Sequence, residues 1–319
     1  MPDPATPGAP AASVLLREPT PWGVRLTLNR PAKLNAMDTE LREALVAAIV
    51  AAERDDAVRV IAIAGAGRAF CSGYDLAGET PSDVWGWRAV LAEDVAATLA
   101  IWRCSKPVIA QVHGFALAGG LELAMACDLV VAADDARLGE PEIRFGSAPV
   151  TLLMPFLIGQ KATRELLFTG DLIDAAEAHR LGLVNRVVPA DRLAAEVDAL
   201  AETLARVEPD VMAPTKLMLN RAMEAAGFLA AVEAGLDLQS IVNTSATARA
   251  FDEIVRRDGL KAALAWRDRR YEERLADRGR WAGERARTHH PDGRARAVGR
   301  VRRLHEATVG PSSCGRCGI

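Results

Sequence analysis

The sequence predicts an α/β domain with parallel strands, followed by a block of helices. Residues 24–28 alternate between apolar and polar side chains, which is typical of a half-buried strand. A helical pattern follows Asp38, and residues 58–64 then form an almost continuous apolar run, as in a strand covered on both faces. Strand, helix and strand in this order imply a right-handed parallel crossover. From residue 152 onward helical spacing dominates, so helices are expected to follow the α/β core.

The first predicted helix begins with Asp38, whose carboxylate can accept hydrogen bonds from the free N–H groups of the first turn. Its predicted buried face carries Leu41, Leu45, Ala48, Ile49 and Ala52. Ahead of the first strand, residues 1–12 are rich in proline and alanine, so we expect a disordered N-terminus there.

Composition narrows the class of protein. The chain has 319 residues, half of them hydrophobic and a quarter charged, which fits one large globular domain plus an appendage. Its net charge of −3 is uneven, because residues 272–319 hold 11 arginines and 6 acidic residues and leave a net charge of −8 on the preceding part. A net-acidic body argues against a nucleic-acid-binding main domain. The Arg-rich tail, 272–319, is expected to be disordered and inert, with an RNA or acidic partner as the alternative.

Cysteine usage and targeting signals favour a cytoplasmic protein. The five cysteines do not form a secreted disulfide framework, and the one Cys-x-x-Cys, at Cys314 and Cys317, has no second pair to complete a metal site. Residues 1–21 lack the basic-then-apolar pattern of a signal peptide, and no apolar run approaches membrane-spanning length. We therefore expect a cytoplasmic enzyme or binding protein that acts away from membranes.

The most informative stretch joins an apolar strand to a helix through two glycines. An apolar run over 107–113 predicts a buried strand, which breaks at Ala118-Gly119-Gly120 before a helix over 121–127. The free N–H groups and the dipole at such a helix start suit a developing negative charge, and the missing side chain at Gly119 lets a ligand oxygen approach. Glu122 lies about one helical turn further on and can face the same space. The alternative is a glycine packing junction beside a surface glutamate.

A second glycine-containing turn, residues 65–76, follows the apolar strand. Its spacing does not complete a dinucleotide-binding fingerprint, because Phe70 occupies the place of the third glycine. We instead predict a tight turn at Gly73 that exposes the N–H group of Tyr74.

Nucleophilic catalysis is an alternative function for the same turn. Cys71 or Ser72 would be the nucleophile and His113 its base. Neither side chain lies in a Gly-x-Ser-x-Gly elbow, and a cysteine in an apolar turn is more often a packing residue.

Two further stretches carry candidate ligand-binding residues. Trp85 and Trp87 lie in a segment of mixed polarity ahead of a helix expected over about 89–102. They either line a ligand pocket or pack a loop, and packing is the more common case. Pro141 restricts the backbone just before Glu142. A lone glutamate beside a proline is usually a solvated loop residue, so a role for Glu142 requires a partner.

The second half of the chain is predicted to be mainly helical. The expected helices cover residues 160–168, 175–181, 192–207, 214–226, 229–255 and 260–269. Gly182 is expected to end one of them before a strand over 183–188. The apolar stripes of these helices have to pack on the core or on neighbouring subunits.

Several motifs together resemble the crotonase (enoyl-CoA hydratase/isomerase) superfamily. They are Arg30-Pro31-Ala32-Lys33-Leu34-Asn35-Ala36-Met37, Phe70-Cys71-Ser72-Gly73-Tyr74-Asp75-Leu76, the stretch Gly114–Asp128, Pro141-Glu142-Ile143 and Ala175–Val184. The resemblance extends from about Trp22 to Trp266. It implies a core of repeated ββα units over 13–207 and C-terminal helices over 208–271 that build a homotrimer, commonly paired into a hexamer. It also implies a coenzyme A thioester as substrate.

The resemblance further implies roles for individual residues. The backbone N–H groups of Tyr74 and Gly119 would form an oxyanion hole for the thioester carbonyl oxygen. Glu122 would activate water as the base, and Glu142 would donate a proton to the α-carbon. The residues implied in binding coenzyme A or the acyl group are Lys33, Ala36, Cys71, Gly73, Asp75, Leu76, Trp85 and Gly120, with Lys261 as a weaker candidate. No metal or redox cofactor is implied, because coenzyme A is part of the substrate.

The paired glutamates favour an enoyl-CoA hydratase, a lyase of fatty acid metabolism, because adding water across a double bond needs both a base and an acid. The alternatives are a Δ3–Δ2 enoyl-CoA isomerase, in which one glutamate moves the proton, an acyl-CoA thioesterase, and a non-enzymatic RNA-associated or structural family member.

Two departures from common hydratase motifs concern the acyl pocket. Tyr74 stands where many hydratases have a small residue, and residues 146–155 replace a glycine cluster. As a third departure, Trp85 and Trp87 lie in the region that most determines acyl specificity in this superfamily, so an aromatic or cyclic acyl group stays open.

Overall fold

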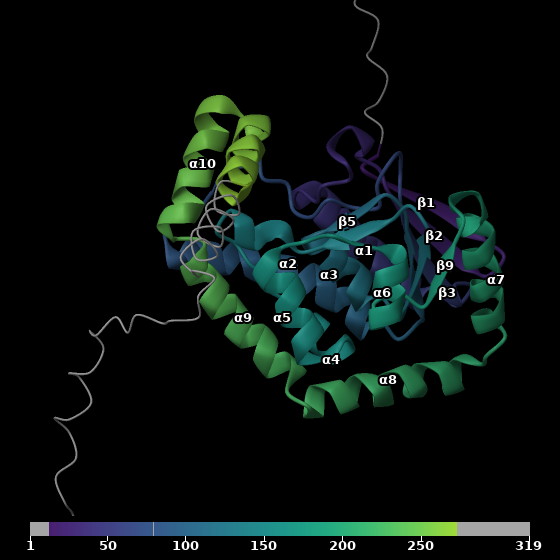
Figure 1. The fold of residues 1–319 in the computed structure, drawn as a ribbon. Coiled ribbons are helices and arrows are strands. Elements are labelled where there is room, and N and C mark those ends of the chain that lie inside the picture. Colours follow the sequence, from purple (N-terminus) through teal and green to yellow (C-terminus); the bar gives the residue numbers. More distant parts are fainter. Residues whose placement is uncertain (1–12, 79, 273–319) are drawn as a thin grey trace, which may run out of the picture. The chain divides into compact units, whose positions relative to one another are not determined.

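The computed structural model describes residues 13–78 and 80–272. Its contacts divide the chain into two units, 1–269 and 270–319, and every helix and strand that carries a label below belongs to the first (Figure 1). Two predicted segments lie outside the described residues: the N-terminus, 1–12, and all but the first residue of the tail, 272–319. Cys314 and Cys317 belong to that tail.

A six-stranded main sheet forms the centre of the first unit, with the strand order β1-β2-β3-β4-β6-β9. Its strands are β1 (Leu15–Thr20), β2 (Gly23–Leu28), β3 (Val60–Gly65), β4 (Val108–Val112), β6 (Leu129–Ala133) and β9 (Arg186–Val188). β1, which the sequence pattern did not predict, pairs antiparallel with β2, and the other neighbouring strands pair in parallel. Helix α1 (Thr39–Arg54) connects β2 to β3, which confirms the predicted parallel crossover.

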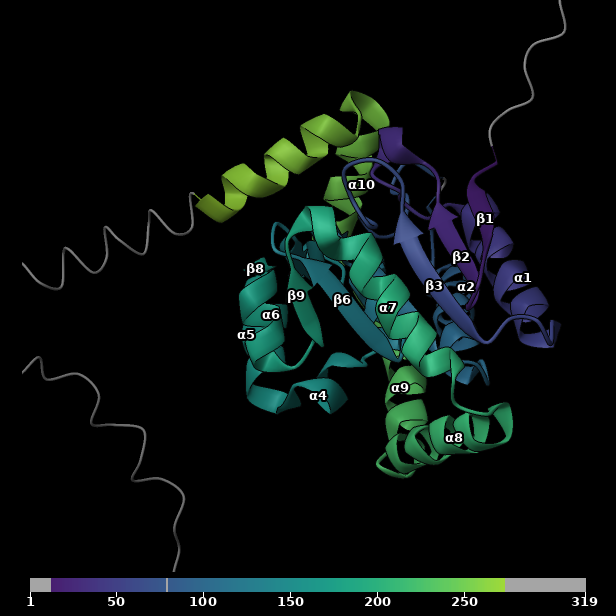
Figure 2. The same ribbon diagram turned by 90° about the vertical axis from the view of Figure 1, so that its right-hand side faces the viewer.

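Different helices cover the two faces of the main sheet. On one face, Ile61 and Ile63 of β3 share a core with α1, α2 (Val84–Arg103) and α3 (Gly119–Ala126). On the opposite face, Val60 and Ala62 pack with α7 (Leu193–Ala205), which lies across the sheet in Figure 2. Because both faces are buried, the strand reads as a continuous apolar run in the sequence.

A small second sheet brings two candidate stretches together. It consists of β5 (Phe115–Leu117), β7 (Arg137–Gly139) and β8 (Ile173–Asp174) in the order β5-β7-β8. β5 lies between β4 and α3, so the chain does not pass directly from the apolar strand into the helix as expected. Leu117 of β5 pairs with Gly139 of β7. This pairing places the start of α3 beside the 3-10 helix η2 (Pro141–Arg144), which carries Glu142.

Three predicted helix boundaries were wrong, in part because local caps were overlooked. α2 begins at Val84, since Asp83 accepts a hydrogen bond from the N–H of Gly86 (2.9 Å), and Trp85 and Trp87 therefore lie on this helix. The single helix expected over 229–255 is two helices, α9 (Phe228–Val242) and α10 (Ala246–Asp258), because Ser245 caps the second. α8 (Pro209–Ala225) begins at Pro209 rather than at Pro214.

Two predicted helices agree closely with the structure, since α5 (Gly159–Thr169) and α6 (Ala175–Leu181) match the helices expected over 160–168 and 175–181. Residues 260–272 are also helical, where a helix was expected over 260–269. The short helices η1 (Pro31–Lys33), α4 (Met154–Leu157) and η3 (Ala190–Arg192) were not predicted. Asp38 caps α1 by accepting from the N–H of Leu41 (2.9 Å), and Gly182 ends α6 with a φ of +94°, as predicted. Within the described ranges no single helix is long and apolar enough to cross a membrane. Helices α8 and α9 together reach the length and apolar composition of a membrane-spanning segment, but the pair is bent by 58°.

Candidate active site

Two glycine-containing turns meet at the start of α3. A Cβ atom on Gly73 would lie 2.8 Å from the Cβ of Ala118 and 3.3 Å from the backbone nitrogen of Gly119. A Cβ atom on Gly119 would lie only 2.3 Å from Cε2 of Tyr74. These distances exclude larger side chains at both glycines unless the neighbours move, so the two backbones depend on glycine for their close approach.

Backbone pairing holds the same two turns in register. Cys71 and Ala116 form an isolated parallel bridge. The N–H of Cys71 donates to the carbonyl of Phe115, and the N–H of Leu117 donates to the carbonyl of Cys71, each at 3.0 Å. Gly120 packs on this bridge, because a Cβ atom there would lie 2.4 Å from the carbonyl oxygen of Cys71.

The backbone N–H groups of Tyr74 and Gly119 donate no hydrogen bond to any other described residue. Gly119 is the first residue of α3, where a helix has no carbonyl to accept its N–H. Tyr74 forms a bridge with Met37 in which the N–H groups of Met37 and Asp75 make the hydrogen bonds, at 2.8 Å and 2.9 Å. In this pairing the N–H of Tyr74 points away from Met37. Both amides are therefore available to bind a ligand oxygen.

Ala118 directs the second of these amides through a strained backbone. Its φ of +54° and ψ of −133° lie in a region used mainly by glycine, at a cost of about 1–3 kcal/mol. Its N–H donates to the carbonyl of Gly139 (2.9 Å), and its carbonyl accepts from Leu121 and Glu122 (2.8 and 3.0 Å). These bonds on both sides hold the conformation that orients Gly119.

Two residues that the sequence analysis did not assign to the site, Arg30 and Asn35, support the turn that carries Tyr74. Arg30 pairs with Asp75 at 3.0 Å and with Asp38 at 2.8 Å. Asn35 is fully buried with a φ of +56°, and its amide donates to the carbonyl of Ala69 (2.7 Å). Asparagine tolerates this left-handed conformation better than most residues, so Asn35 fits the position.

Glu122 lies in the first turn of α3 and is only 2% exposed. Its Oε1 accepts a hydrogen bond from the N–H of Thr151 at 2.6 Å. Burial is the main cause that raises the pKa of Glu122 to about 7, and the neighbouring charge of Glu142 adds to it, while the bond from Thr151 opposes the shift. A carboxyl with this pKa can both take up and release a proton near neutral pH.

Glu142 lies in η2 and is 8% exposed. Burial raises its pKa to about 7, and its contact with Glu140 partly opposes that rise. Glu140, 1% exposed, was not singled out from the sequence, although the Glu-Pro-Glu spacing around Pro141 was visible. The buried carboxyl groups of Glu122, Glu140 and Glu142 thus shift one another's pKa values.

None of the described residues forms a metal site. Neither these three glutamates nor any other group of three His, Cys, Asp or Glu side chains in the described chain is arranged to hold a metal ion.

Asp94 on α2 is a fourth buried acid, also missed from the sequence. It pairs with the buried Arg42 at 2.7 Å, and its backbone carbonyl accepts a hydrogen bond from the Tyr74 hydroxyl at 3.2 Å. Burial raises the pKa of Asp94 to about 7 against the effect of Arg42. Burial and the charges of Asp94 and Glu122 also raise the pKa of Tyr74, so its hydroxyl stays neutral. Tyr74 therefore belongs to both regions: its backbone N–H is one of the two free amides, and its hydroxyl is hydrogen-bonded to Asp94 of the acidic cluster.

The residues predicted to bind coenzyme A or the acyl group fall into two sets. Ala36, Cys71, Gly73, Asp75 and Gly120 lie in or against the two turns, with Lys33 and Leu76 exposed nearby along the chain. The carboxylate of Asp75 is already engaged by Arg30. Trp85 is 79% exposed on α2, and Lys261 is exposed in the C-terminal helical segment.

The side chains proposed for nucleophilic catalysis are not bonded to one another. The thiol of Cys71 is fully buried and donates to the carbonyl of Asn35 at 3.2 Å, and burial raises its pKa to about 12. Ser72 donates to the carbonyl of Lys33 at 3.4 Å, and a ring nitrogen of His113 lies 2.9 Å from the carbonyl of Gly67. No nucleophile–base pair is formed by these three residues.

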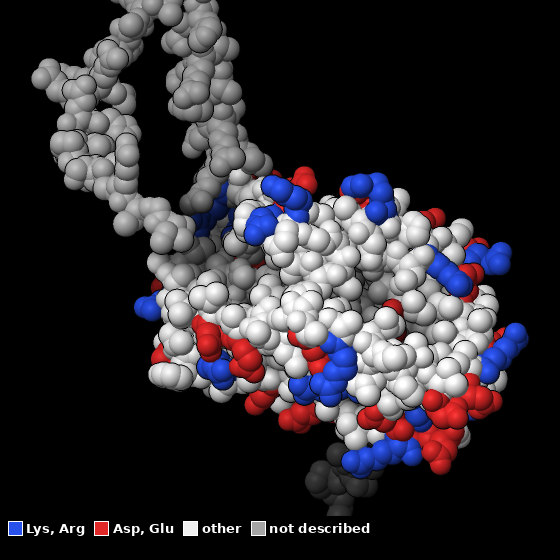
Figure 3. Space-filling model, turned by 90° about the horizontal axis from the view of Figure 1, so that it is seen from below, with Lys and Arg blue, Asp and Glu red and all other residues white. Residues whose placement is uncertain are grey.

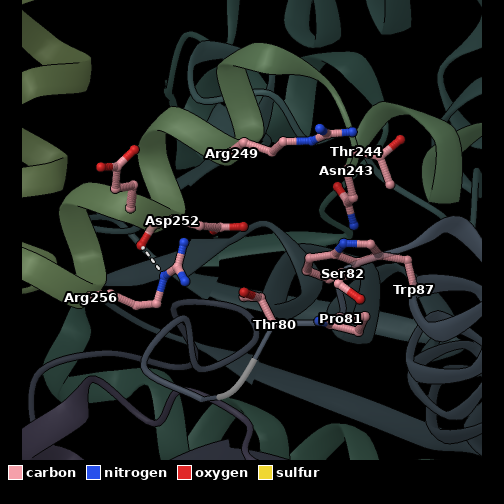
Figure 4. A pocket seen from close by; sticks show the side chains of 10 residues that line it. Thr80, Pro81, Ser82, Trp87, Asn243, Thr244, Arg249, Asp252 and Arg256 are labelled. Atoms are coloured by element: carbon pink, nitrogen blue, oxygen red, sulfur yellow. Dashed lines mark hydrogen bonds between the residues drawn. The ribbon is translucent and has the colours of Figure 1, made fainter.

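A cavity of about 380 Å³ lies between the start of α2 and the α9–α10 corner (Figure 4). It is lined by Thr80, Pro81, Ser82, Trp87, Asn243, Thr244, Arg249, Asp252, Glu253 and Arg256. Trp87 forms part of its wall, whereas Trp85 does not. The sequence analysis gave Trp85 and Trp87 the same two alternatives, but only Trp87 lines this cavity.

A polar chain connects this cavity to the loop that follows Glu142. Gln239 donates to the side-chain oxygens of Asn243 (2.8 Å) and Ser147 (2.6 Å). The N–H of Ser147 donates to the carbonyl of Glu142 at 3.0 Å. Close by in the sequence, Phe145 stacks on Phe251 of α10 with ring centroids 4.6 Å apart. The segment that replaces the expected glycine cluster is thus positioned by α9 and α10.

The family described as "Enoyl-CoA hydratase/isomerase" matches residues 24–261. A crotonyl-CoA hydratase from Syntrophomonas wolfei is 39% identical over 180 residues, which cover 55% of this chain and 69% of the relative. A short-chain-enoyl-CoA hydratase from Clostridium acetobutylicum is 34% identical over 205 residues, covering 62% of this chain and 78% of the relative.

Solved structures of other proteins share this fold. An enoyl-CoA hydratase/isomerase from Xanthobacter autotrophicus Py2 is 42% identical with a TM-score of 0.79, and the match covers 81% of this chain and 98% of that one. An enoyl-CoA hydratase from Mycobacterium smegmatis is 28% identical with a TM-score of 0.76, covering 80% and 93% of the two chains. The similarity therefore extends over the sheet and the helices that surround the two turns and the carboxyl cluster.

Proposed function

The chain belongs to the enoyl-CoA hydratase/isomerase family, and we propose that it is an enoyl-CoA hydratase that adds water reversibly to a 2-enoyl-coenzyme A thioester. It has the crotonase fold, a mixed α/β core followed by C-terminal helices. The observation that carries the proposal is the pair of buried glutamates, Glu122 and Glu142, each with a pKa near 7. Hydration needs a base for water and an acid for carbon, and two such carboxyls can supply both.

The two free amides have a defined part in this reaction. Attack of water on the β-carbon moves electrons onto the thioester oxygen, which becomes an enolate oxygen. The N–H groups of Tyr74 and Gly119 would donate to that oxygen and stabilise its charge. Removal of one comparable donor costs about 2.7–4 kcal/mol of transition-state stabilisation elsewhere. Both donors belong to the backbone, so the side chain of Tyr74 is not itself required for this bond.

The protons balance between the two carboxyls. Glu122 takes a proton from water as its oxygen bonds to the β-carbon, and Glu142 gives a proton to the α-carbon as the enolate collapses. The site then holds one proton, as before, but on Glu122 instead of Glu142. Dehydration is the reverse. Because the active form carries one proton on the pair, kcat/KM should be bell-shaped in pH.

The isomerase alternative makes a different demand on the same residues. Moving a double bond from position 3 to position 2 requires only that one carboxyl remove and return a proton. An ionisable second carboxyl with a pKa near 7 is not required for that step, whereas it is for hydration. The hydratase proposal therefore accounts for more of the site.

Purified protein mixed with crotonyl-CoA tests the proposal through loss of the enone absorbance. We expect rapid hydration of the 2-enoyl thioester and little conversion of a matched 3-enoyl thioester. Conversion of the 3-enoyl substrate without hydration would favour the isomerase, and hydrolysis to free coenzyme A would favour a thioesterase. Inactivity on short and longer 2-enoyl thioesters would contradict the hydratase assignment.

We further propose that the chain forms a homotrimer, or a hexamer of two trimers, through its C-terminal helices. α8 buries only Lys216 within the described chain and exposes Val211, Leu217, Met218 and Leu219. In Figure 3, which views the molecule from below Figure 1, charged side chains gather mainly near the edges and leave broad uncharged areas between them. An apolar helix face of this kind favours burial against another subunit.

Sedimentation of the full chain tests this assembly. We expect a trimer or hexamer for the wild type and smaller species when both Met218 and Leu219 are changed to Lys. Leu16→Lys on β1 is the matched control, because Leu16 is another exposed apolar residue outside α8. A wild-type monomer at micromolar concentration would contradict the proposal. We also propose that the protein acts in the cytoplasm and needs no metal or redox cofactor.

A further inference from the structure

Glu140 is a third buried carboxyl that the hydration mechanism does not use. It directly precedes η2, it is 1% exposed, and neither of its carboxyl oxygens accepts a hydrogen bond from a donor group of the described chain. Oε2 of Glu142 is equally without such a donor. Buried oxygens of this kind are costly unless they find a hydrogen-bond partner. The arrangement therefore requires a partner for both residues.

The two glutamates can satisfy each other. Only Pro141 separates Glu140 from Glu142, both side chains are buried, and the carboxyl group of each shifts the pKa of the other. Two ionised carboxylates can only repel, but a protonated carboxyl donates its hydrogen to an ionised one. A hydrogen bond to a charged acceptor is among the stronger ones in proteins. One proton held between Glu140 and Glu142 therefore removes the unpaired oxygens and the repulsion together.

The charged surroundings indicate that the proton is retained. Glu140 faces Glu142 on its own segment and Glu122 from α3. Beyond Glu122 lie Asp94 from α2 and the hydroxyl of Tyr74. The cation bound into this cluster is Arg42, which pairs with Asp94 and Glu93, and within the described chain none of the three glutamates forms a salt bridge. Neutralisation by a proton is then the way to bury so many acids together.

Glu140 is the member that holds this proton more tightly. Burial and the charges of Glu142 and Glu122 raise the pKa of Glu140 well above its usual range, whereas contact with Glu140 lowers the pKa of Glu142. Burial raises the pKa of both residues, but their mutual contact raises the pKa of Glu140 and lowers that of Glu142, because a donor stabilises the ionised form of its acceptor.

We propose that Glu140 is a positioning residue that stays protonated through the catalytic cycle and donates its carboxyl hydrogen to Glu142. This bond stabilises the ionised form of Glu142 and fixes its rotamer, so that Glu142 can release a proton to the α-carbon and recover it in the reverse reaction. The role rests on the proposed hydratase function. Without the bond, burial alone would keep Glu142 protonated and make it a weaker acid.

Two variants of Glu140 separate this role from mere packing. Glu140→Gln keeps an N–H donor of nearly the same shape, whereas Glu140→Met fills similar space without a donor. In Glu140→Met we expect the alkaline limb of the kcat/KM profile, where Glu142 loses its proton, to move to higher pH by about one to two units. The plateau should also fall by about 10-fold, since a weaker acid transfers its proton more slowly. In Glu140→Gln both limbs should stay within about 0.5 pH unit of the wild type.

An infrared titration of the ligand-free protein gives a readout that does not depend on turnover. We expect the carboxylic-acid C=O band of a buried protonated carboxyl to persist at pH 9 in the wild type and in Glu142→Gln, and to be lost in Glu140→Gln. The absence of that band in the wild type would overturn the proposal even if the protein hydrates crotonyl-CoA. Equal pH profiles for Glu140→Met and Glu140→Gln would overturn it as well. If the protein is not a hydratase but the band behaves as expected, the proposed function fails while the shared proton stands.

Discussion

The two turns and the carboxyl cluster present reactive groups in opposite ways. At the turns, the amides of Tyr74 and Gly119 belong to the backbone, and glycine contacts too close for a Cβ atom set their positions. In the cluster, the reactive groups are side chains, and burial sets their protonation. Substitutions that add atoms to the turns should therefore lower activity, whereas substitutions that remove charge from the cluster should change its dependence on pH.

Adding one methyl group to the turns should have the largest effect. In Gly119→Ala the new Cβ would lie 2.3 Å from the Tyr74 ring, so either the ring or the amide has to move. By analogy with the loss of one oxyanion donor, we expect kcat/KM for crotonyl-CoA to fall by about 100- to 1,000-fold. Gly78→Ala is the matched control, because no atom lies within 4 Å of a Cβ there. Wild-type activity in Gly119→Ala would show that this amide does not bind the substrate oxygen.

The carboxyl cluster should make stability fall as pH rises. A glutamate with a folded pKa near 7 binds its proton more tightly than in the unfolded chain, so its contribution is complete below about pH 4.5 and is lost as pH rises toward 7. Glu142→Gln removes this loss, so between pH 5 and pH 8 it should gain up to about 3 kcal/mol in unfolding free energy relative to the wild type. Urea unfolding at both pH values measures the difference.

Glu43→Gln serves as the control for this series, since Glu43 is exposed on α1. It should follow the wild type at both pH values. If Glu142→Gln also follows the wild type, the carboxyl is not buried in a charge-sensitive site, and the contrast between the two regions fails.

Loosening the support of the turns should have a moderate effect. Arg30→Lys keeps a charge but cannot bind Asp75 and Asp38 together with the same planar group. We expect kcat/KM to fall by about 10-fold through a less fixed Tyr74 amide, because small misplacements of a catalytic group are costly. Arg25→Lys is the control, since Arg25 pairs with Asp198 on the α7 side of the sheet. A similar loss of activity in both variants would point to general destabilisation instead.

The cavity beside α10 should give the smallest effect. Trp87 lines it, whereas Trp85 is largely exposed. If the acyl chain reaches this cavity, Trp87→Ala should change KM by about 3- to 10-fold for long 2-enoyl thioesters and leave crotonyl-CoA unchanged. Trp85→Ala should be silent on both. Equal effects of the two variants would exclude the cavity from acyl recognition.

The fold was predictable where the signal is local. Asp38, Gly182 and the apolar run of β3 each specify their element through a cap, a left-handed glycine or two-sided burial. The missed boundaries at Asp83 and Ser245 also had local cap signals, which were overlooked. β1 was not predicted, because its residues are mostly exposed and show no clear alternation.

The candidate site was only partly predictable. Glu122, Glu142 and the two amides were assigned from motifs, whereas Glu140 and Asp94 look like ordinary polar residues in the sequence. Their burial follows from long-range packing, since the pairing of Leu117 with Gly139 brings Glu140 against α3, and Arg42 reaches Asp94 from another helix. Sequence patterns report periodicity along one element and do not report which elements meet.

The most direct test compares crotonyl-CoA hydration by the wild type, Glu122→Gln and Glu142→Gln over a range of pH. If both carboxyls act, kcat should fall by about 100-fold or more in each variant, in line with the contribution of general acid–base groups, and each variant should lose one limb of the bell-shaped profile. The Glu122 variant should lose the acid limb and the Glu142 variant the alkaline limb. A variant that keeps wild-type activity and both limbs would show that its carboxyl is a bystander, and the two-carboxyl mechanism would be wrong.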